Sequence, residues 1–209
     1  MDIRLYLVTD RSLSQGRPLS WVVEEAVKGG VTMVQLREKD CPTGEFLSLA
    51  IALKKCLQPY RVPLIINDRL DIALACDAEG LHIGQQDMPY KVARRLLGAD
   101  KIIGLSVENL SDVEQANALD VNYIGISPVF DTSTKTDTAT ALGLEGVREI
   151  TRLSVHPSVG IGGINASNAA AIVEAGATGI SVVSAIMSAT DPQKAAAELK
   201  QIIHLSPSK

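Results

Sequence analysis

Met33-Val34-Gln35-Leu36-Arg37-Glu38-Lys39 is an apolar run that becomes polar at its end. Side chains alternate between the two faces of a strand, so Gln35, Arg37 and, past the strand end, Lys39 share one face. An amide and two cations suit an anion such as a diphosphate, because arginine offers a planar fork of donors and lysine a mobile charge. The alternative is a solvated charge run in which Glu38 neutralises a neighbour. The position of Arg37 inside an otherwise apolar strand favours the anion site.

Outward from this segment, short aliphatic runs alternate with longer amphipathic runs along the chain, a pattern typical of successive βαβ units and a parallel sheet. The expected strands are Arg4–Thr9, Thr32–Arg37, Pro63–Asn67, Gly80–Gly84, Ile102–Val107, Tyr123–Ser127, Ser158–Gly162 and Gly179–Ser184. The expected helices lie near Ser20–Gly29, Thr43–Leu57, Leu70–Ala75, Pro89–Leu97, Ser111–Ala118, Gly143–Leu153, Asn165–Ala175 and Asp191–His204. Eight pairs favour closure into an α/β (β/α)8 TIM barrel, with one domain over residues 1–209.

Helix starts are also signalled by residue chemistry. Asp191 before Pro192 suits an N-cap followed by the first helical residue. The predicted N-caps are Ser20, Thr43, Ser111, Ser167 and Asp191.

An open doubly wound sheet is the rival fold, since the same alternation permits it. That fold usually carries G-x-G-x-x-G after its first strand. Here the first strand ends Val8-Thr9-Asp10-Arg11, which favours the barrel.

The composition favours a small-molecule ligand over a nucleic acid or a membrane. The 20 Lys and Arg against 24 Asp and Glu give a net charge of −4 without a basic stripe, so a nucleic-acid surface is not expected. No apolar stretch is long enough to span a bilayer, and the first one is too short for a signal peptide. We therefore expect a cytoplasmic protein with reduced buried thiols at Cys41, Cys56 and Cys76.

Acidic side chains follow the third and fourth expected strands, in Asn67-Asp68 and in the run that ends at Asp87. Neighbouring parallel strands lie about 4.8 Å apart, so the two carboxylates can approach one Mg²⁺ from adjacent loops. Alternatively, each caps the helix that follows it. His82 is expected to be an interior histidine with its hydrogen bonds satisfied, not a catalyst.

Hydroxyls, a lysine and glycines follow the last four strands. Ser106 ends the fifth strand, and the sixth leads into Thr132-Ser133-Thr134-Lys135, which can reach a phosphate and a leaving group. Gly162-Gly163 lets backbone N–H groups approach a phosphate, and barrels often bind one between the loops after strands seven and eight. A solvated loop and a tight turn are the alternatives. Two anionic subsites on one rim suit a transfer between two phosphorylated molecules.

At these residues the sequence resembles the thiamine phosphate synthases, also called thiamine-phosphate pyrophosphorylases, from Leu5 to about Met187. The matching motifs occur in order and are specific as a set. They are Gln35-Leu36-Arg37-Glu38-Lys39, Asn67-Asp68, His82-Ile83-Gly84-Gln85 with Asp87, Gly104-Leu105-Ser106, Ser127-Pro128-Val129-Phe130 with Thr132-Ser133-Thr134-Lys135, Gly162-Gly163-Ile164 and Val183-Ser184.

The resemblance implies a transferase that joins 4-amino-5-hydroxymethyl-2-methylpyrimidine diphosphate to 4-methyl-5-(2-hydroxyethyl)thiazole phosphate, giving thiamine phosphate and diphosphate. A pyrimidine methyl cation forms on the way, so the protein chiefly positions groups and stabilises charge. The resemblance implies Mg²⁺ at Asp68 and Asp87. The implied pyrimidine diphosphate ligands are Gln35, Arg37, Lys39, Asn67, Ser106 and Lys135, with Arg37, Lys39, Ser106 and Lys135 as the catalytic groups. The implied thiazole phosphate ligands are Thr132, Ser133, Thr134, Gly163, Val183 and Ser184.

The sequence departs from the common family pattern at two positions. Ser127 stands where glycine often precedes Pro128, and Asp131 stands where proline is frequent. Neither change removes an implied ligand, but both leave the shape of the loop open.

Two other functions fit the same predicted barrel. The related thiazole tautomerases resemble the synthases on the same barrel, but they carry a histidine shortly after the serine of the fifth strand, and Ser106-Val107-Glu108 offers none. A non-catalytic phosphate-binding protein has no reason to keep both carboxylates and both anion sites. The sequence leaves open whether the chain forms a homo-oligomer.

Overall fold

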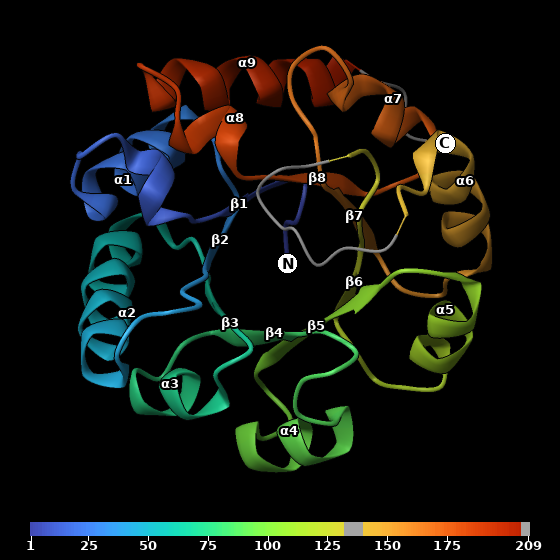
Figure 1. Ribbon diagram of the computed structural model, residues 1–209, viewed down its shortest axis with the longest axis horizontal. Coiled ribbons are helices and arrows are strands. Elements are labelled where there is room, and N and C mark those ends of the chain that lie inside the picture. The colour runs from blue at the N-terminus through green and yellow to red at the C-terminus, as the bar shows by residue number, and fades with distance from the viewer. Residues whose placement is uncertain (132–139, 206–209) are drawn as a thin grey trace.

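The eight aliphatic runs form eight parallel strands that close into a barrel in the order β1 to β8, with β1 paired to both β2 and β8 (Figure 1). The structure, a computed structural model, describes residues 1–131 and 140–205. The strands are β1 (Leu5–Val8), β2 (Met33–Leu36), β3 (Leu64–Asn67), β4 (Gly80–Ile83), β5 (Ile102–Val107), β6 (Tyr123–Ile126), β7 (Ser158–Ile161) and β8 (Gly179–Val182). The prediction of a (β/α)8 barrel is confirmed.

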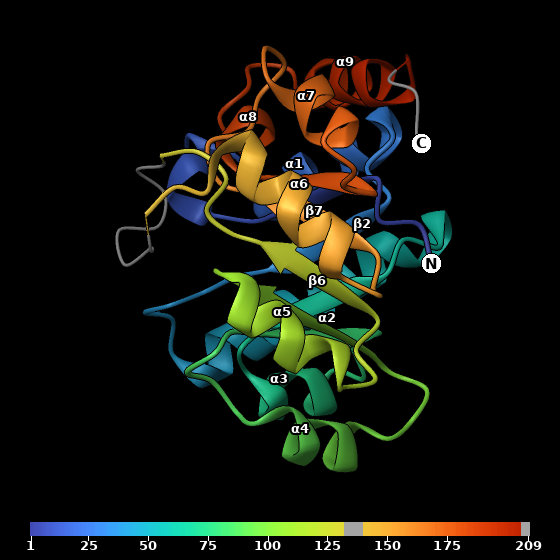
Figure 2. The same ribbon diagram turned by 90° about the vertical axis from the view of Figure 1, so that its right-hand side faces the viewer.

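Helices surround the ring of strands, and from the side α5 and α6 lie next to each other outside it (Figures 1 and 2). The α-helices are α1 (Leu19–Gly29), α2 (Thr43–Leu57), α3 (Leu70–Ala75), α4 (Tyr90–Leu97), α5 (Leu110–Asn117), α6 (Gly143–Leu153), α7 (Ala169–Glu174), α8 (Ser184–Met187) and α9 (Pro192–Leu205). The 3-10 helices of the described residues are η1 (Arg11–Ser14) and η2 (Gln58–Tyr60). Within the described part of the chain, no helix is both long enough and apolar enough to cross a membrane.

The alternation of strand side chains divides the core in two. The outward-facing residues, such as Leu7, Val34 and Ile66, pack against the helices. A smaller interior cluster fills the barrel, and it contains Ile3, Tyr6, Met33, Ile65, Tyr123 and Val159. Side chains therefore plug the barrel and leave its rim to form a site.

The start of α9 agrees with the predicted caps, because Asp191 accepts a hydrogen bond from the Lys194 N–H at 2.9 Å. The other four predicted N-caps are wrong. The N-caps of α1, α2, α5 and α7 are Pro18, Pro42, Asn109 and Asn168. Among these four, Asn109 makes a side-chain capping bond, to the Asp112 N–H.

The three cysteines are free thiols, as expected, although Cys76 is buried while Cys41 and Cys56 are half-buried. Burial raises the pKa of the Cys76 thiol and keeps it in the protonated form.

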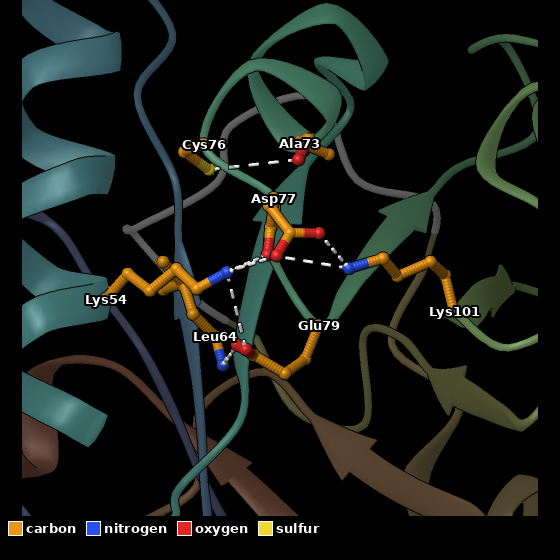
Figure 3. Close-up of polar contacts among 7 residues, drawn as sticks. All are labelled: Lys54, Leu64, Ala73, Cys76, Asp77, Glu79 and Lys101. Atoms are coloured by element: carbon orange, nitrogen blue, oxygen red, sulfur yellow. Dashed lines mark hydrogen bonds and ion pairs between the residues drawn. The ribbon is translucent and has the colours of Figure 1, made fainter. Parts of the chain in front are cut away.

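The opposite end of the barrel, where the strands begin, carries a small ionic cluster (Figure 3). Asp77 lies between Lys101, whose Nζ is 2.5 Å from Oδ1, and Lys54, whose Nζ is 3.0 Å from Oδ2. Glu79 accepts a hydrogen bond from the Leu64 N–H at 2.9 Å. In barrels of this kind this end serves stability, whereas chemistry takes place at the other.

Asp77→Asn is expected to lower the melting temperature slightly at pH 7, with an effect that disappears in acid. Lys101 and then Lys54 lower the pKa of Asp77 to about 2. A lowered folded-state pKa stabilises the protein above the ordinary aspartate pKa of about 3.9, and this contribution is lost as the pH falls toward 2. Thermal unfolding of both proteins between pH 7 and pH 2 tests this. Asp100→Asn is the control, because Asp100 is exposed and has no ion pair among the described residues. An equal loss at pH 7 and pH 2 would contradict the ionic role.

Candidate functional site

A cavity of about 370 Å³ opens where the strands end. It is lined from every side of the barrel, because each strand delivers its last inward-facing residues to the same rim. Ten of the sequence-predicted site residues line it: Gln35, Arg37, Lys39, Asn67, Asp68, Asp87, Ser106, Gly163, Val183 and Ser184. The other four, Thr132, Ser133, Thr134 and Lys135, lie outside the described residues.

Arg37 is half-buried in this cavity, and none of the described acidic side chains pairs with it. The adjacent Glu38 instead pairs with Arg11, with 2.8 Å between Oε2 and the guanidinium, and its side chain is only 8% exposed. Arg11 also pairs with Glu45 on α2. The alternative of a self-neutralised charge run is therefore wrong for Glu38 and Arg37, and the guanidinium keeps its donors for a ligand.

Lys39 and Asp68 form an ion pair beside Arg37. Nζ of Lys39 is 2.6 Å from Oδ2 of Asp68, and the Asn67 amide donates to Oδ1 at 2.5 Å. Asp68 has a φ of +60°, a left-handed conformation that a non-glycine residue adopts at a cost and that is common at functional sites. It makes no side-chain cap on α3. The turn after β3 thus serves to place this carboxylate in the cavity.

Asp87 lies next to Asp68 and accepts a hydrogen bond from the Gly84 N–H at 2.7 Å. Burial raises the pKa of Asp87, and the hydrogen bond and charge of Asp68 raise it further, against the opposing effects of Gly84 and Lys39. Two carboxylates so close together are typical of a site that a cation or a proton completes. The described residues contain no cluster of three or more His, Cys, Asp or Glu side chains arranged for a metal. A carboxylate pair still suits Mg²⁺, which usually takes one or two carboxylates along with water and substrate phosphates.

A chain of buried hydrogen bonds runs beneath the cavity from β2 to β5. Gln35 donates from Nε2 to the Tyr6 hydroxyl at 2.7 Å, and the Tyr6 and Tyr123 hydroxyls are 2.8 Å apart. His82 lies between the Tyr123 hydroxyl and Ser106 Oγ, each 2.9 Å from a ring nitrogen. The sequence-based prediction of an interior, hydrogen-bonded His82 agrees with this position.

The opposite side of the cavity is built from backbone. Gly162 and Gly163 have φ values of +103° and +63°, and a Cβ on Gly163 would lie 2.7 Å from the Asp131 carbonyl oxygen. Nearby, β8 ends at Val182, and the short helix α8 begins at Ser184 instead of the strand continuing as expected. The first N–H groups of a helix have no partner within it. This side therefore offers the backbone donors that a phosphate requires.

Several further residues line the cavity that were not predicted as site residues from the sequence. Thr9 accepts a hydrogen bond from the Arg37 N–H at 3.2 Å, and Gln85 donates to the Ser106 carbonyl at 2.7 Å. Glu108, Ser127 and the buried Ser181 also line the cavity. The position of each at or just beyond a strand end was the available signal.

Comparisons with known proteins agree on one family. A family model described as thiamine monophosphate synthase matches residues 5–186. The thiamine-phosphate synthase of Albidiferax ferrireducens is 54% identical over 201 residues, covering 96% of this chain and 92% of that protein. That of Syntrophomonas wolfei is 52% identical over 201 residues and 96% of each chain. The solved structure of the thiamine phosphate pyrophosphorylase of Pyrococcus furiosus has a TM-score of 0.88 at 39% identity, covering 97% of this chain and 96% of that one.

Proposed function

The chain belongs to the thiamine monophosphate synthase family, and from this premise we propose that its rim cavity joins a pyrimidine diphosphate to a thiazole phosphate. The chain is a transferase that forms thiamine phosphate, as its curated relatives are named. The substrates are 4-amino-5-hydroxymethyl-2-methylpyrimidine diphosphate and 4-methyl-5-(2-hydroxyethyl)thiazole phosphate.

One observation supports the assignment of the diphosphate half above the others. Arg37 has no acidic partner among the described residues, and it shares a cavity with the Asp68–Asp87 carboxylate pair. A free guanidinium beside two carboxylates suits a ligand that brings both its own negative charge and a cation. A magnesium diphosphate has both properties.

Different residues of the cavity have different roles when the carbon–oxygen bond of the pyrimidine diphosphate breaks. Gln35 and Ser106 hold the pyrimidine at the cavity floor, so that its methylene carbon faces the incoming thiazole nitrogen. Arg37, Lys39 and Asn67 donate to the diphosphate oxygens, where negative charge grows as the bond to carbon breaks. The thiazole nitrogen then attacks the pyrimidine methyl cation. No nucleophile from the protein is needed.

Asp68 and Asp87 hold Mg²⁺ in this proposal. Their proximity, their oxygen donors and the raised pKa of Asp87 fit a divalent cation. When bound, Mg²⁺ neutralises charge on the departing diphosphate. Lys39 then has to exchange its contact with Asp68 for one with the diphosphate.

The thiazole phosphate binds on the backbone side, at Gly163, Val183 and Ser184. Thr132, Ser133 and Thr134, which rest on the family resemblance alone, complete this subsite.

Lys135→Ala is expected to reduce kcat by about a hundredfold or more and to change the Kd for thiazole phosphate little. The family resemblance assigns Lys135 to stabilising the leaving group, a contribution that exists mainly in the transition state. Steady-state rates and calorimetric binding of thiazole phosphate measure the two effects. A variant with unchanged kcat would exclude this role.

A thiazole tautomerase is the alternative on the same barrel. The segment Ser106-Val107-Glu108 has no histidine such as those enzymes carry shortly after this serine, and the cationic side of the cavity is retained. The high identity to curated synthases also favours transfer over isomerisation.

The deciding experiment is an assay of the purified chain with both substrates and Mg²⁺, in which thiamine phosphate and diphosphate are expected in equal amounts. Omitting the pyrimidine diphosphate should stop all turnover. Conversion of the thiazole phosphate alone would identify a tautomerase.

The cellular setting follows from this chemistry. Both substrates are small anionic metabolites, and we propose that the enzyme meets them in the cytoplasm. The proposed site residues all belong to one chain, so the proposal does not require a homo-oligomer.

A further inference from the structure

We propose that the buried hydrogen-bond chain Gln35–Tyr6–Tyr123–His82–Ser106 fixes which groups at the rim donate hydrogen bonds and which accept them. Tyr6 and Tyr123 are then positioning residues, and through them the site selects an aminopyrimidine over the corresponding oxopyrimidine. This inference rests on the proposed function for the identity of the ligand. The chain of hydrogen bonds itself does not depend on that function.

The two tyrosines cannot act by touching substrate. Both are fully buried, and neither lines the cavity. Of the five residues of this hydrogen-bond chain, Gln35 on β2, His82 on β4 and Ser106 on β5 line the cavity. Any effect of the tyrosines on the ligand must therefore pass through the residues they hold.

Two glycines in the barrel interior leave space for the side chains of this hydrogen-bond chain. A Cβ on Gly104 would lie 2.1 Å from Cζ of Tyr123, and one on Gly125 would lie 3.2 Å from Cε1 of His82. The aromatic rings thus occupy space that any larger residue on β5 or β6 would take. The Tyr6 and Tyr123 rings also meet edge to face, with centroids 5.7 Å apart. Packing and hydrogen bonding together fix the ring positions.

The tyrosines remain neutral phenols throughout the working pH range. Burial raises the pKa of both hydroxyls well above the ordinary value for tyrosine. Each hydroxyl therefore carries one proton, and it can donate only one hydrogen bond along the chain.

This single proton gives the chain a direction. Gln35 donates from Nε2 to the Tyr6 hydroxyl, whereas either hydroxyl of the Tyr6–Tyr123 contact can be the donor. Because Tyr6 already accepts from Gln35, we assign its own proton to Tyr123, and the proton of Tyr123 to Nδ1 of His82. His82 then carries its proton on Nε2 and donates to Ser106 Oγ. At the rim, Gln35 is left with its carbonyl oxygen as an acceptor, and Ser106 with its hydroxyl proton as a donor.

An aminopyrimidine matches this polarity. Its amino group donates to the Gln35 oxygen, whereas an oxo group at the same position would place two acceptors against each other. Sites that satisfy a substrate N–H with a fixed acceptor discriminate strongly, because the wrong analogue leaves a buried group unpaired. If the hydrogen-bond chain is interrupted, the side-chain amide of Gln35 can rotate and exchange its acceptor for its donor. The preference for the amino substrate over the oxo substrate then falls.

Tyr123→Phe tests this inference, because it removes one hydroxyl from the hydrogen-bond chain and leaves Gln35, Ser106 and the ligand unchanged. We measure kcat/KM for the amino substrate and for the 4-oxo pyrimidine diphosphate. The ratio of the two is expected to fall by at least tenfold in the variant. An equal loss for both substrates, leaving the ratio unchanged, would reduce Tyr123 to a packing role and overturn the inference. Tyr6→Phe is the second variant, for use if Tyr123→Phe does not fold.

Tyr90→Phe is the matched control. It removes a tyrosine hydroxyl that donates to the Asp120 carbonyl at 2.6 Å, outside the barrel interior. In this variant the ratio of kcat/KM for the amino substrate to kcat/KM for the oxo substrate is expected to equal that of the unmodified protein.

A measurement without substrate separates this inference from the proposed function. The chain has three histidines, so the ring nitrogens of His82 can be observed by ¹⁵N NMR and assigned with His82→Gln. The proposed direction requires the proton on Nε2 and an unprotonated Nδ1. A proton on Nδ1 would reverse the chain and overturn the inference, whether or not the protein forms thiamine phosphate.

Discussion

Excess EDTA will reduce thiamine phosphate formation below detection, a loss of more than about a thousandfold, and added Mg²⁺ will restore it. The physical reason is that Asp68 and Asp87 form the cavity's only close carboxylate pair among the described residues, next to the cations assigned to the diphosphate. A diphosphate leaving without its cation has to carry the developing charge on hydrogen bonds alone. A thousandfold loss corresponds to about 4 kcal/mol of transition-state stabilisation, which is within the range that metal ions supply.

Asp68→Asn and Asp87→Asn locate this effect. Each is expected to lower kcat/KM by about a hundredfold and to raise the Mg²⁺ concentration that gives half-maximal activity, because an amide is a weaker ligand than a carboxylate. Asp120→Asn is the control, since Asp120 is exposed in the loop before β6, at the end of the barrel opposite to the cavity, and its backbone carbonyl accepts hydrogen bonds from Tyr90 and Arg94. Full activity in EDTA, or an unchanged Mg²⁺ requirement in both variants, would remove the metal from the proposal.

Arg37→Ala will lower kcat/KM for the pyrimidine diphosphate by about a hundredfold to a thousandfold. The guanidinium is half-buried, faces the cavity and has no acidic partner among the described residues, so its interactions are available to the ligand. Charge-assisted hydrogen bonds contribute about 1.5–3 kcal/mol each, and a bidentate contact makes two. Steady-state kinetics with the pyrimidine diphosphate varied measures the loss.

Arg37→Lys and Arg152→Ala complete the test of this residue. Lysine keeps the charge without the planar fork, so it should recover only part of the activity. Arg152 is exposed on α6 and distant from the cavity, and its removal should leave kcat/KM unchanged. If Arg37→Ala retained full activity, the diphosphate would have to bind elsewhere.

The barrel could be predicted from the sequence because its signals are local. Each strand is an aliphatic run, and each ends in the polar residues that line the rim, as Gln35 and Arg37 illustrate. The helix caps were predicted less well. Ser20 and Thr43 have suitable chemistry, but α1 and α2 begin beside Pro18 and Pro42, where the loop geometry sets the first turn.

The partners of the site residues could not be predicted, because they lie far apart in sequence. Arg11 reaches Glu38 across 27 positions, and this contact is what leaves Arg37 free of Glu38. Tyr6 and Tyr123 are 117 positions apart, and each appears in the sequence as an ordinary core aromatic. Their contact requires knowing which strands face each other across the closed barrel.

The pairing of β1 with β8 also has a consequence for how the chain is made. β1 is synthesised before the other seven strands, and β8 is synthesised after them. At a synthesis rate of roughly 5 to 20 residues per second, β1 waits on the order of ten seconds or longer with one edge unpaired. During that interval the nascent chain exposes an aliphatic strand edge, the kind of surface that favours aggregation. The emergence of β8, not that of any earlier βα unit, is therefore the first moment at which the barrel can close and its rim site can form.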